Sequence, residues 1–547
     1  MDAPVTWPSD SEEHKETGRP SVQSRRGEEL RIVSPLEELR AIYSSPFFWT
    51  IAAELPCNQI REQKFGRPQD YPDWLLFLLV CAAGITGIST VRSSVALFVD
   101  QKFWNDFARD VDQFVPTGWT GIADLDHSLG KHEARRRPRT GRPRKQRQTH
   151  AGNVVSLAPR IGAVAPRRHH LSYFAMKWRG RKKVNGRFEP MSPGDPWWGV
   201  RQQVFAKFRE VTMVQAQLQG LLNPLMPFRW QRPNREQFVG FDGTIFPMTT
   251  KRASTACADH ASGGSVKPVY GTKFTIASLR INGVYGSRLI VDFAHNGTDP
   301  LSDYPNEGAA TKGMALRLKQ EAQGGMKGIT VDSVVRGSDL VELQRNGVTV
   351  VNYPHAHRNP GSKDGGRLAE GRQEKGHLRT VITCDNSIGG TCEHPIYLHG
   401  GSVVERFIAA DGTPNYRPVN VVGYDQRQGK SVRREYLIVR LECTLCGTSE
   451  HRIPLFHTDH TSTDPEANWG EYARVFPPDT PQFKFLYGAR NDTESRHTNL
   501  KARVTHLPPD VAGQQLRLIG AAITSNSVAW QLYQQENDEP NVFDNTA

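Results

Sequence analysis

Three acidic residues of this sequence stand where they could do chemistry. Asp242, in "GFDGT", and Asp332, in "GITVDSV", each follow a short apolar run that predicts a buried strand. A carboxylate at the end of a buried strand is costly unless it is paired or binds a cation. Near the end of the chain, "FLYGARNDTESRHTNLKARV" holds a third acid, Glu494, among basic residues. These acids are candidates for one functional site.

The residues around Glu494 are spaced for one face of a single helix. Steps of 3, 7 and 14 residues separate Tyr487 from Arg490, Glu494 and Lys501. At 100° per residue these steps fall at about 300°, 340° and 320°. Such a face is too polar for a core stripe. A solvated charged face is the alternative, but a tyrosine and one acid among bases favour a site.

The pattern Y-x2-R-x3-E-x6-K resembles the signature of bacterial insertion-sequence transposases of the DDE type. In that family the first acid lies on the first strand of an RNase H-like sheet, often before Gly-Thr. The second acid ends the fourth strand, and the glutamate lies on a later helix. The resemblance covers about residues 235–535 and assigns the three catalytic positions to Asp242, Asp332 and Glu494.

The resemblance implies Mg²⁺-dependent DNA cleavage and strand transfer. Two Mg²⁺ ions roughly 4 Å apart would activate the nucleophile and stabilise the leaving oxygen, and hard cations prefer carboxylate oxygens. Asp242 would be shared between the ions, with Asp332 and Glu494 holding one each. Three further residues would then grip the DNA phosphates of the transposon end, by the same resemblance: Tyr487, Arg490 and Lys501.

Other acids compete for these roles. Asp292 also ends a predicted strand, "RLIVDFA", and is the main rival of Asp332. Asp339 and Asp492 are interpreted as a helix-start residue and a surface residue. For Asp332 itself, the alternative is a cap of a helix or turn.

The elements that must position these acids follow an order of strand, strand, strand, helix, strand, helix and strand from about residue 237. This order predicts a mixed sheet flanked by helices. The expected fold class is α/β, an RNase H-like mixed-sheet catalytic core with a β-rich insertion, preceded by a helical N-terminal domain. The expected segments are a disordered tail (1–32), a helical DNA-binding-like domain (33–125), a basic linker (126–190), the first part of the core (191–354), the insertion (355–480), and the signature and C-terminal helices of the core (481–535).

The charge of the chain favours a polyanionic partner. The net charge is +12 over 547 residues, and it is concentrated in "KHEARRRPRTGRPRKQRQTH" at 131–150, which favours nucleic acid over general solubility. Within that stretch, "GRPRKQ" resembles the core of an AT-hook, which lies in a narrow minor groove. The residues expected to contact DNA there are Arg142, Arg144 and Lys145. The alternative is a solvated linker that contacts phosphates only.

Cysteines in the insertion predict a structural metal. The interval from Asp332 to Glu494 is 494 − 332 = 162 positions, more than a bare core needs. "CTLCG" contains a C-x2-C pair typical of zinc knuckles, and a looser pair precedes it. We expect Zn²⁺ to be held on two β-hairpins by Cys384, Cys392, Cys443 and Cys446. The alternative is four buried thiols that happen to lie close together.

The predicted function is a transposase that binds terminal inverted repeats and carries out Mg²⁺-dependent DNA cleavage and strand transfer. Its expected partners are double-stranded DNA, as transposon ends and target, and a second copy of itself in a homodimer. The alternatives are a domesticated transposase-derived DNA-binding protein and another RNase H-like metal nuclease. A polar N-terminus without an apolar signal region predicts a cytoplasmic, nucleoid-associated protein without a membrane span. Trp469 is interpreted as a core residue, with base stacking as the alternative.

Overall fold

The structure divides into two compact units. It is a computed structural model that describes residues 34–59, 71–85, 98, 101–125, 165–248, 256–260, 266–280, 288–354, 377–385, 389–428, 433–455, 472–504 and 507–537. One unit is built around residues 212–501, and the other combines residues 33–211 with 502–547. The segments expected to carry the catalytic acids therefore belong to the first unit.

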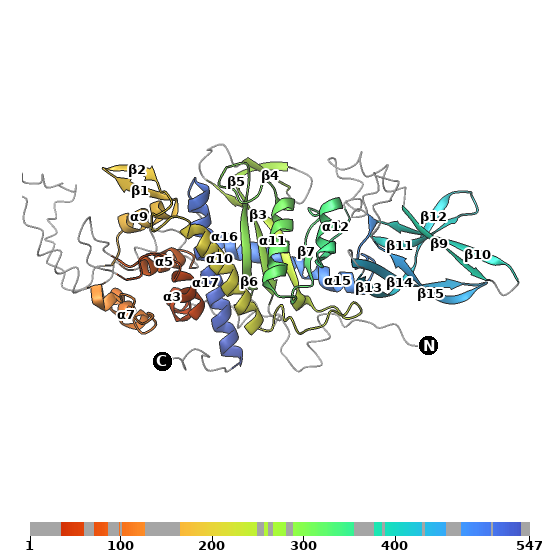
Figure 1. Ribbon diagram of the computed structural model, residues 1–547, viewed down its shortest axis with the longest axis horizontal. Coiled ribbons are helices and arrows are strands. Elements are labelled where there is room, and N and C mark those ends of the chain that lie inside the picture. The colour runs from red at the N-terminus through yellow and green to blue at the C-terminus, as the bar shows by residue number, and fades with distance from the viewer. Residues whose placement is uncertain are drawn as a thin grey trace, which may run out of the picture. The chain divides into compact units, whose positions relative to one another are not determined.

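A mixed sheet forms the centre of the first unit (Figure 1). Its strand order is β6-β5-β3-β7-β8, and β4 pairs with β5 as well. β3, β5 and β6 pair antiparallel, whereas β7 runs parallel to β3 and β8 runs parallel to β7. The strands are β3 (Phe238–Pro247), β4 (Ala256–His260), β5 (Val266–Arg280), β6 (Arg288–Asn296), β7 (Gly328–Thr330) and β8 (Thr349–Val351). The sheet is preceded by the short helix η1 (Arg235–Gln237).

Two helices provide the crossovers that the parallel pairings require. α11 (Glu307–Glu321) connects β6 to β7 and packs on β5 and β6, and α12 (Gly337–Arg345) connects β7 to β8. α11 begins where the Asn306 side chain accepts a hydrogen bond from the Ala309 N–H at 2.9 Å, as an N-cap does. The order of strands and helices agrees with the expected mixed α/β arrangement, with β4 as an addition.

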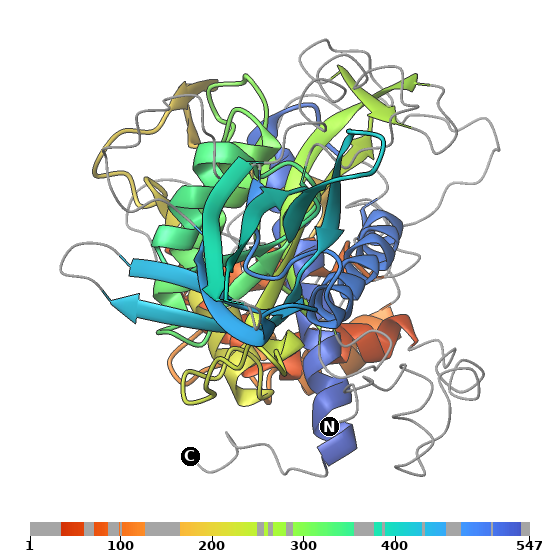
Figure 2. The same cartoon turned by 90° about the vertical axis from the view of Figure 1, so that its right-hand side faces the viewer.

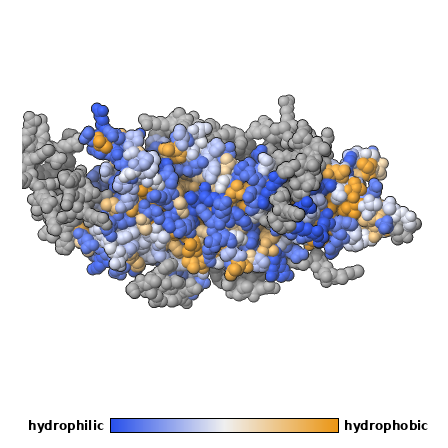
Figure 3. All heavy atoms as spheres, viewed as in Figure 1, coloured by the Kyte–Doolittle hydropathy of each residue, from blue (hydrophilic) through white to orange (hydrophobic). Residues whose placement is uncertain are grey.

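Among the residues that the structure describes, seven strands lie between β8 and α15 (Pro481–Gly488), as expected for a β-rich insertion. They form two sheets, of order β12-β11-β10-β9 and β13-β14-β15, which Figure 2 shows turned toward the viewer. The strands are β9 (His377–Asp385), β10 (Thr391–His399), β11 (Ser402–Ile408), β12 (Pro414–Pro418), β13 (Asn420–Gln428), β14 (Arg433–Cys443) and β15 (Gly447–Pro454). Buried side chains of both sheets, including Ile396 and Leu437, share one core with Phe476 and Phe483. Apolar side chains also gather on the surface of the four-stranded sheet (Figure 3), among them Phe407 and Ile408.

The second unit is mainly helical. Its elements are α3 (Pro35–Ser44), α4 (Pro46–Ala52), α5 (Asp73–Ala82), α7 (Gln101–Val111), α9 (Arg168–Trp178), the hairpin β1 (Arg181–Val184) and β2 (Arg187–Pro190), and α17 (Val511–Asn537), while α10 (Val200–Leu218) begins in this unit and ends in the first. α5 is buried along its whole length, as expected for a core helix. No helix among the described residues is long and apolar enough to cross a membrane.

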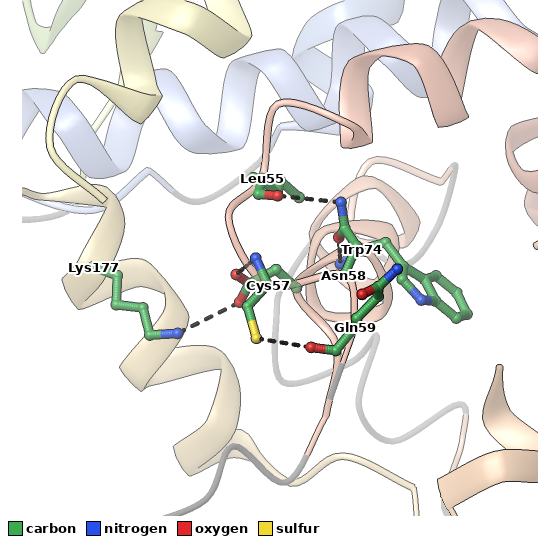
Figure 4. Close-up of polar contacts among 7 residues, drawn as sticks. Leu55, Cys57, Asn58, Gln59, Trp74 and Lys177 are labelled. Carbon is green, nitrogen blue, oxygen red and sulfur yellow. Dashed lines mark hydrogen bonds and ion pairs between the residues drawn. The ribbon is translucent and has the colours of Figure 1, made fainter. Parts of the chain in front are cut away.

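The C-terminal helix packs in the helical unit. α17 contacts α3, α5 and α9, whereas the sequence grouped it with the signature helix of the core. A Cβ on Gly520 would lie 2.9 Å from the Val80 carbonyl oxygen, so this glycine permits the close approach of α17 to α5. A buried ion pair connects α9 to α5 within this unit. Lys177 Nζ lies 3.5 Å from Asp73 Oδ1, and the Cys57 N–H donates to Asp73 Oδ2 at 3.0 Å (Figure 4).

Candidate active site

Asp242 and Asp332 lie side by side at the edge where two parallel strands separate. The pairing of β3 with β7 ends at Gly240, which lies opposite Thr330. Asp242 comes two residues after Gly240, and Asp332 comes two residues after Thr330. The two aspartates therefore occupy matching positions just beyond the end of the β3–β7 pairing. The register thus brings together two acids that lie 332 − 242 = 90 positions apart in the sequence.

Asp242 is not at the end of its strand, as the sequence had suggested. β3 continues to Pro247, because it stays paired with β5 as far as Gly271. Only the pairing with β7 ends before Asp242. The side chain is therefore held on a strand that is anchored on one side and open on the other.

The predicted signature helix is two helices. α15 (Pro481–Gly488) ends before Ala489, and α16 (Arg490–Arg503) begins directly after it. Tyr487 therefore lies on α15, whereas Arg490, Glu494 and Lys501 lie on α16. The prediction of one continuous helix was wrong at this point, because the turn residue Ala489 separates α15 from α16.

α16 brings basic side chains to both aspartates. Arg490 lies 3.6 Å from Asp332 Oδ2, and His497 Nδ1 lies 3.4 Å from Asp242 Oδ2. These two α16 residues are seven positions apart and so occupy the same face of the helix. The backbone of Glu494 lies between them, four residues after Arg490 and three before His497, which places this residue on the same face. Its side chain lies outside the part of the chain that the structure describes.

A further acid, Glu307, borders the site, and the sequence did not indicate it. It is the first residue of α11, and its carboxylate lies 2.7 Å from the Lys273 ammonium. A Cβ on Gly243 would lie 2.5 Å from the Glu307 carboxyl group. The glycine after Asp242, expected to allow close approach of backbone or ligand, therefore makes room for this carboxylate.

The surroundings of Asp242 disfavour its charge. Burial raises the pKa of Asp242, Arg490 opposes that rise, and the negative charges of Glu307 and Asp332 add to it. The resulting pKa is about 6. Only 15% of the side chain is exposed, so water screens this repulsion poorly. Carboxylates that are gathered and largely buried in this way are groups whose charge a divalent cation neutralises.

The other residues of the predicted signature occupy different surroundings. Tyr487 stacks on Phe483 with ring centres 5.1 Å apart and contacts Tyr353 edge-on, and its hydroxyl accepts a 3.5 Å hydrogen bond from Arg490. It therefore positions Arg490 from the edge of the core. Lys501 is half-buried.

The competing aspartates have structural partners. Asp292 is buried and forms an ion pair with Arg317 of α11. Asp339 lies in the first turn of α12 and pairs with Lys312 at 2.8 Å, as expected for a helix-start residue. The side chain of Asp492 is outside the described residues. Asp332 also accepts a hydrogen bond from the N–H of the next residue, Ser333, at 2.7 Å.

Three of the four expected zinc ligands come together. The ligand atoms of Cys392, Cys443 and Cys446 lie within 4.8 Å of one another. Cys384 approaches the group through its carbonyl oxygen, 3.7 Å from Cys446 Sγ. The basic residues Arg142, Arg144 and Lys145 and the tryptophan Trp469 lie outside the described residues.

His497 could have been found from the sequence, since it lies three residues after Glu494 on the predicted helical face. Glu307 could not, because nothing in the start of a helix indicates which strand its first residue meets. Neither a known family model nor a curated protein matches this chain significantly, so the candidate site depends on its own residues and their geometry.

Proposed function

We propose that this chain is a DNA transposase of the DDE type, built on an RNase H-like core, which binds the ends of its element and cuts and joins them with Mg²⁺. The order β6-β5-β3-β7-β8 supports the core assignment. In it, β3, β5 and β6 form an antiparallel meander, whereas β7 and β8 run parallel to β3. We also propose double-stranded DNA and a second copy of the chain as partners.

One observation carries this proposal. Asp242 and Asp332 extend from matching positions on adjacent parallel strands, and the helical face that holds Glu494 lies over them through Arg490 and His497. Two acids far apart in the sequence thus lie side by side, and the helix that carries the third lies over them. A protein that only bound DNA would have no need for this convergence of like charges.

The donor set fits a hard divalent cation. Asp242 and Asp332 offer carboxylate oxygens, and burial, with the charges of Glu307 and Asp332, raises the pKa of Asp242, whose ionised form a cation would favour. Asp242, Asp332 and Glu494 would hold Mg²⁺, which activates the nucleophile and stabilises the leaving oxygen in displacement at phosphorus.

The basic residues of α16 have the role of binding and orienting DNA. Without a cation, Arg490 and His497 lie against Asp332 and Asp242. When a cation neutralises those carboxylates, the same side chains can turn to a phosphate beside the bond that is cut. Lys501, two helical turns further along α16 from Glu494, extends this positive face.

The test uses a plasmid that carries the gene with its natural flanking DNA, incubated with purified protein and Mg²⁺. Asp242→Asn, Asp332→Asn and Glu494→Gln should each lower end cleavage about a thousandfold, which corresponds to about 4 kcal/mol of transition-state stabilisation. DNA binding should persist in all three. Asp339→Asn is the matched control, because it removes a carboxylate from the exposed start of α12 and should cleave normally.

The products distinguish the alternatives. Joining of the cut 3′ ends to a second DNA supports a transposase, whereas cleavage without joining indicates another metal nuclease. Binding without Mg²⁺-dependent cleavage in the unaltered chain would contradict an enzyme and leave the domesticated DNA-binding protein. Unchanged cleavage by any one of the three variants would remove that residue from the site.

A further inference from the structure

The cysteines of the insertion lie where two separate sheets meet. Cys384 and Cys392 are direct partners on the antiparallel strands β9 and β10. Cys443 ends β14, and Cys446 lies in the turn that leads to β15. β9 and β10 belong to the four-stranded sheet, and β14 and β15 to the three-stranded sheet. The two pairs therefore come from different sheets.

The sulfur positions suit a thiophilic cation. The Sγ atoms of Cys392, Cys443 and Cys446 lie within 4.8 Å of one another. Thiolates at about 2.3 Å from a tetrahedral zinc ion lie about 3.8 Å apart, which falls within that range. The described cysteines are free thiols, these three among them, so they do not form disulfides that would exclude a metal.

The turn after β14 directs backbone donors at one of the cysteines. The backbone N–H groups of Leu445 and Cys446 donate hydrogen bonds to the Cys443 sulfur. The Cys446 thiol in turn lies within hydrogen-bond distance of the sulfurs of both Cys392 and Cys443. Backbone N–H groups directed at a sulfur stabilise the thiolate, which is the form that binds a metal.

Cys384 is placed to complete the set. Residues directly opposite each other on an antiparallel pair extend from the same face of the sheet, so Cys384 shares the face of Cys392. Its carbonyl oxygen is already 3.7 Å from Cys446 Sγ.

We propose that Cys384, Cys392, Cys443 and Cys446 bind one structural Zn²⁺ that joins the two sheets of the insertion. Four thiolates close the coordination shell, which is the pattern of structural sites, whereas catalytic zinc sites keep one position open. The ion would tie the ends of two hairpins that also share the apolar core around Ile396 and Leu437 and the hydrogen bond from Arg379 to the Pro454 carbonyl oxygen. This inference does not depend on the proposed DNA chemistry.

The first test is the metal content of the full chain purified under reducing conditions without chelator. We expect about one zinc ion per chain. Cys446→Ser should lose the ion, and Cys57→Ser is the matched control, because Cys57 is a half-buried thiol in the helical unit outside this cluster. Absence of zinc together with no uptake of added Zn²⁺ would refute the proposal. So would equal zinc content in Cys446→Ser and the unaltered chain, and iron in its place would refute the choice of metal.

A second test identifies the fourth ligand and does not depend on a variant that fails to fold. In the unaltered chain, a mercurial thiol reagent should release the zinc, and hydrogen–deuterium exchange should then increase in β9, β10, β14 and β15 but not in α11. Co²⁺ in place of zinc should give the absorption of a tetrahedral four-thiolate site. Cys384→Ser should weaken the sulfur-to-cobalt band, and an unchanged spectrum would exclude Cys384 as a ligand.

Discussion

Replacing Asp242 by asparagine should stabilise the metal-free protein. Burial, together with Glu307 and Asp332, raises the pKa of Asp242 from 3.8 to about 6 despite the opposing charge of Arg490. That difference corresponds to about 3 kcal/mol of unfavourable interaction with the ionised carboxylate. Asparagine keeps the shape of the side chain and removes the charge, so it should recover most of this free energy.

Because the pKa of Asp242 is raised on folding, the stability gained by Asp242→Asn should depend on pH. A carboxyl group with a raised pKa binds its proton more tightly in the folded state, so the unaltered protein loses stability as pH rises from about 4 to above 6. The free energy of unfolding of Asp242→Asn should therefore exceed that of the unaltered chain by about 3 kcal/mol at pH 8 and by about half of that at pH 5. Added Mg²⁺ should stabilise the unaltered chain and leave the variant unchanged, because only the former retains the complete donor set.

Asp292→Asn is the matched control and should have the opposite sign. This aspartate lies in the same sheet, but it is buried against Arg317, and removal of one member of a buried pair costs about 3–5 kcal/mol. Urea unfolding followed by circular dichroism in magnesium-free buffer measures both variants. The unfolding transition whose urea midpoint is lowered in Asp292→Asn is that of the unit that contains the sheet. If Asp242→Asn also lowered the urea midpoint of this transition at pH 8, the Asp242 carboxylate would stabilise the fold, and the reasoning would be refuted.

Three further predictions concern separate parts of the molecule. Gly243→Ala should lower end cleavage about a hundredfold, because its Cβ would displace the Glu307 carboxylate from beside Asp242; cleavage kinetics at the normal rate would show that this carboxylate has no role. Arg490→Ala should weaken binding to element ends and reduce the slope of log Kd against log salt concentration by about 1 in titrations; a slope equal to that of the unaltered chain would exclude a phosphate contact. Asp73→Asn should lower the free energy of unfolding of the helical unit by about 3 kcal/mol in denaturant titrations, because Lys177 would remain buried without its partner carboxylate; no loss would mean that the pair is energetically neutral.

Local patterns in the sequence were sufficient for much of the fold. Short apolar runs predicted the strands that became β3, β5, β6 and β7, and the predicted order also held a helix on each side of β7. The short turn that holds Cys443 and Cys446 was also evident from the sequence, because it is formed by adjacent residues between β14 and β15. Such features depend on interactions within a few positions of the chain.

The sequence by itself therefore determined which residues carry carboxylates, thiols and basic groups, and on which kinds of element they lie. Only the tertiary structure decided that Asp242 and Asp332 are neighbours, because their alignment comes from the β3–β7 register. It also placed Glu307 beside them and His497 against Asp242. The physical reason is that strand register and helix docking are set by packing between distant segments, and no local pattern records that packing.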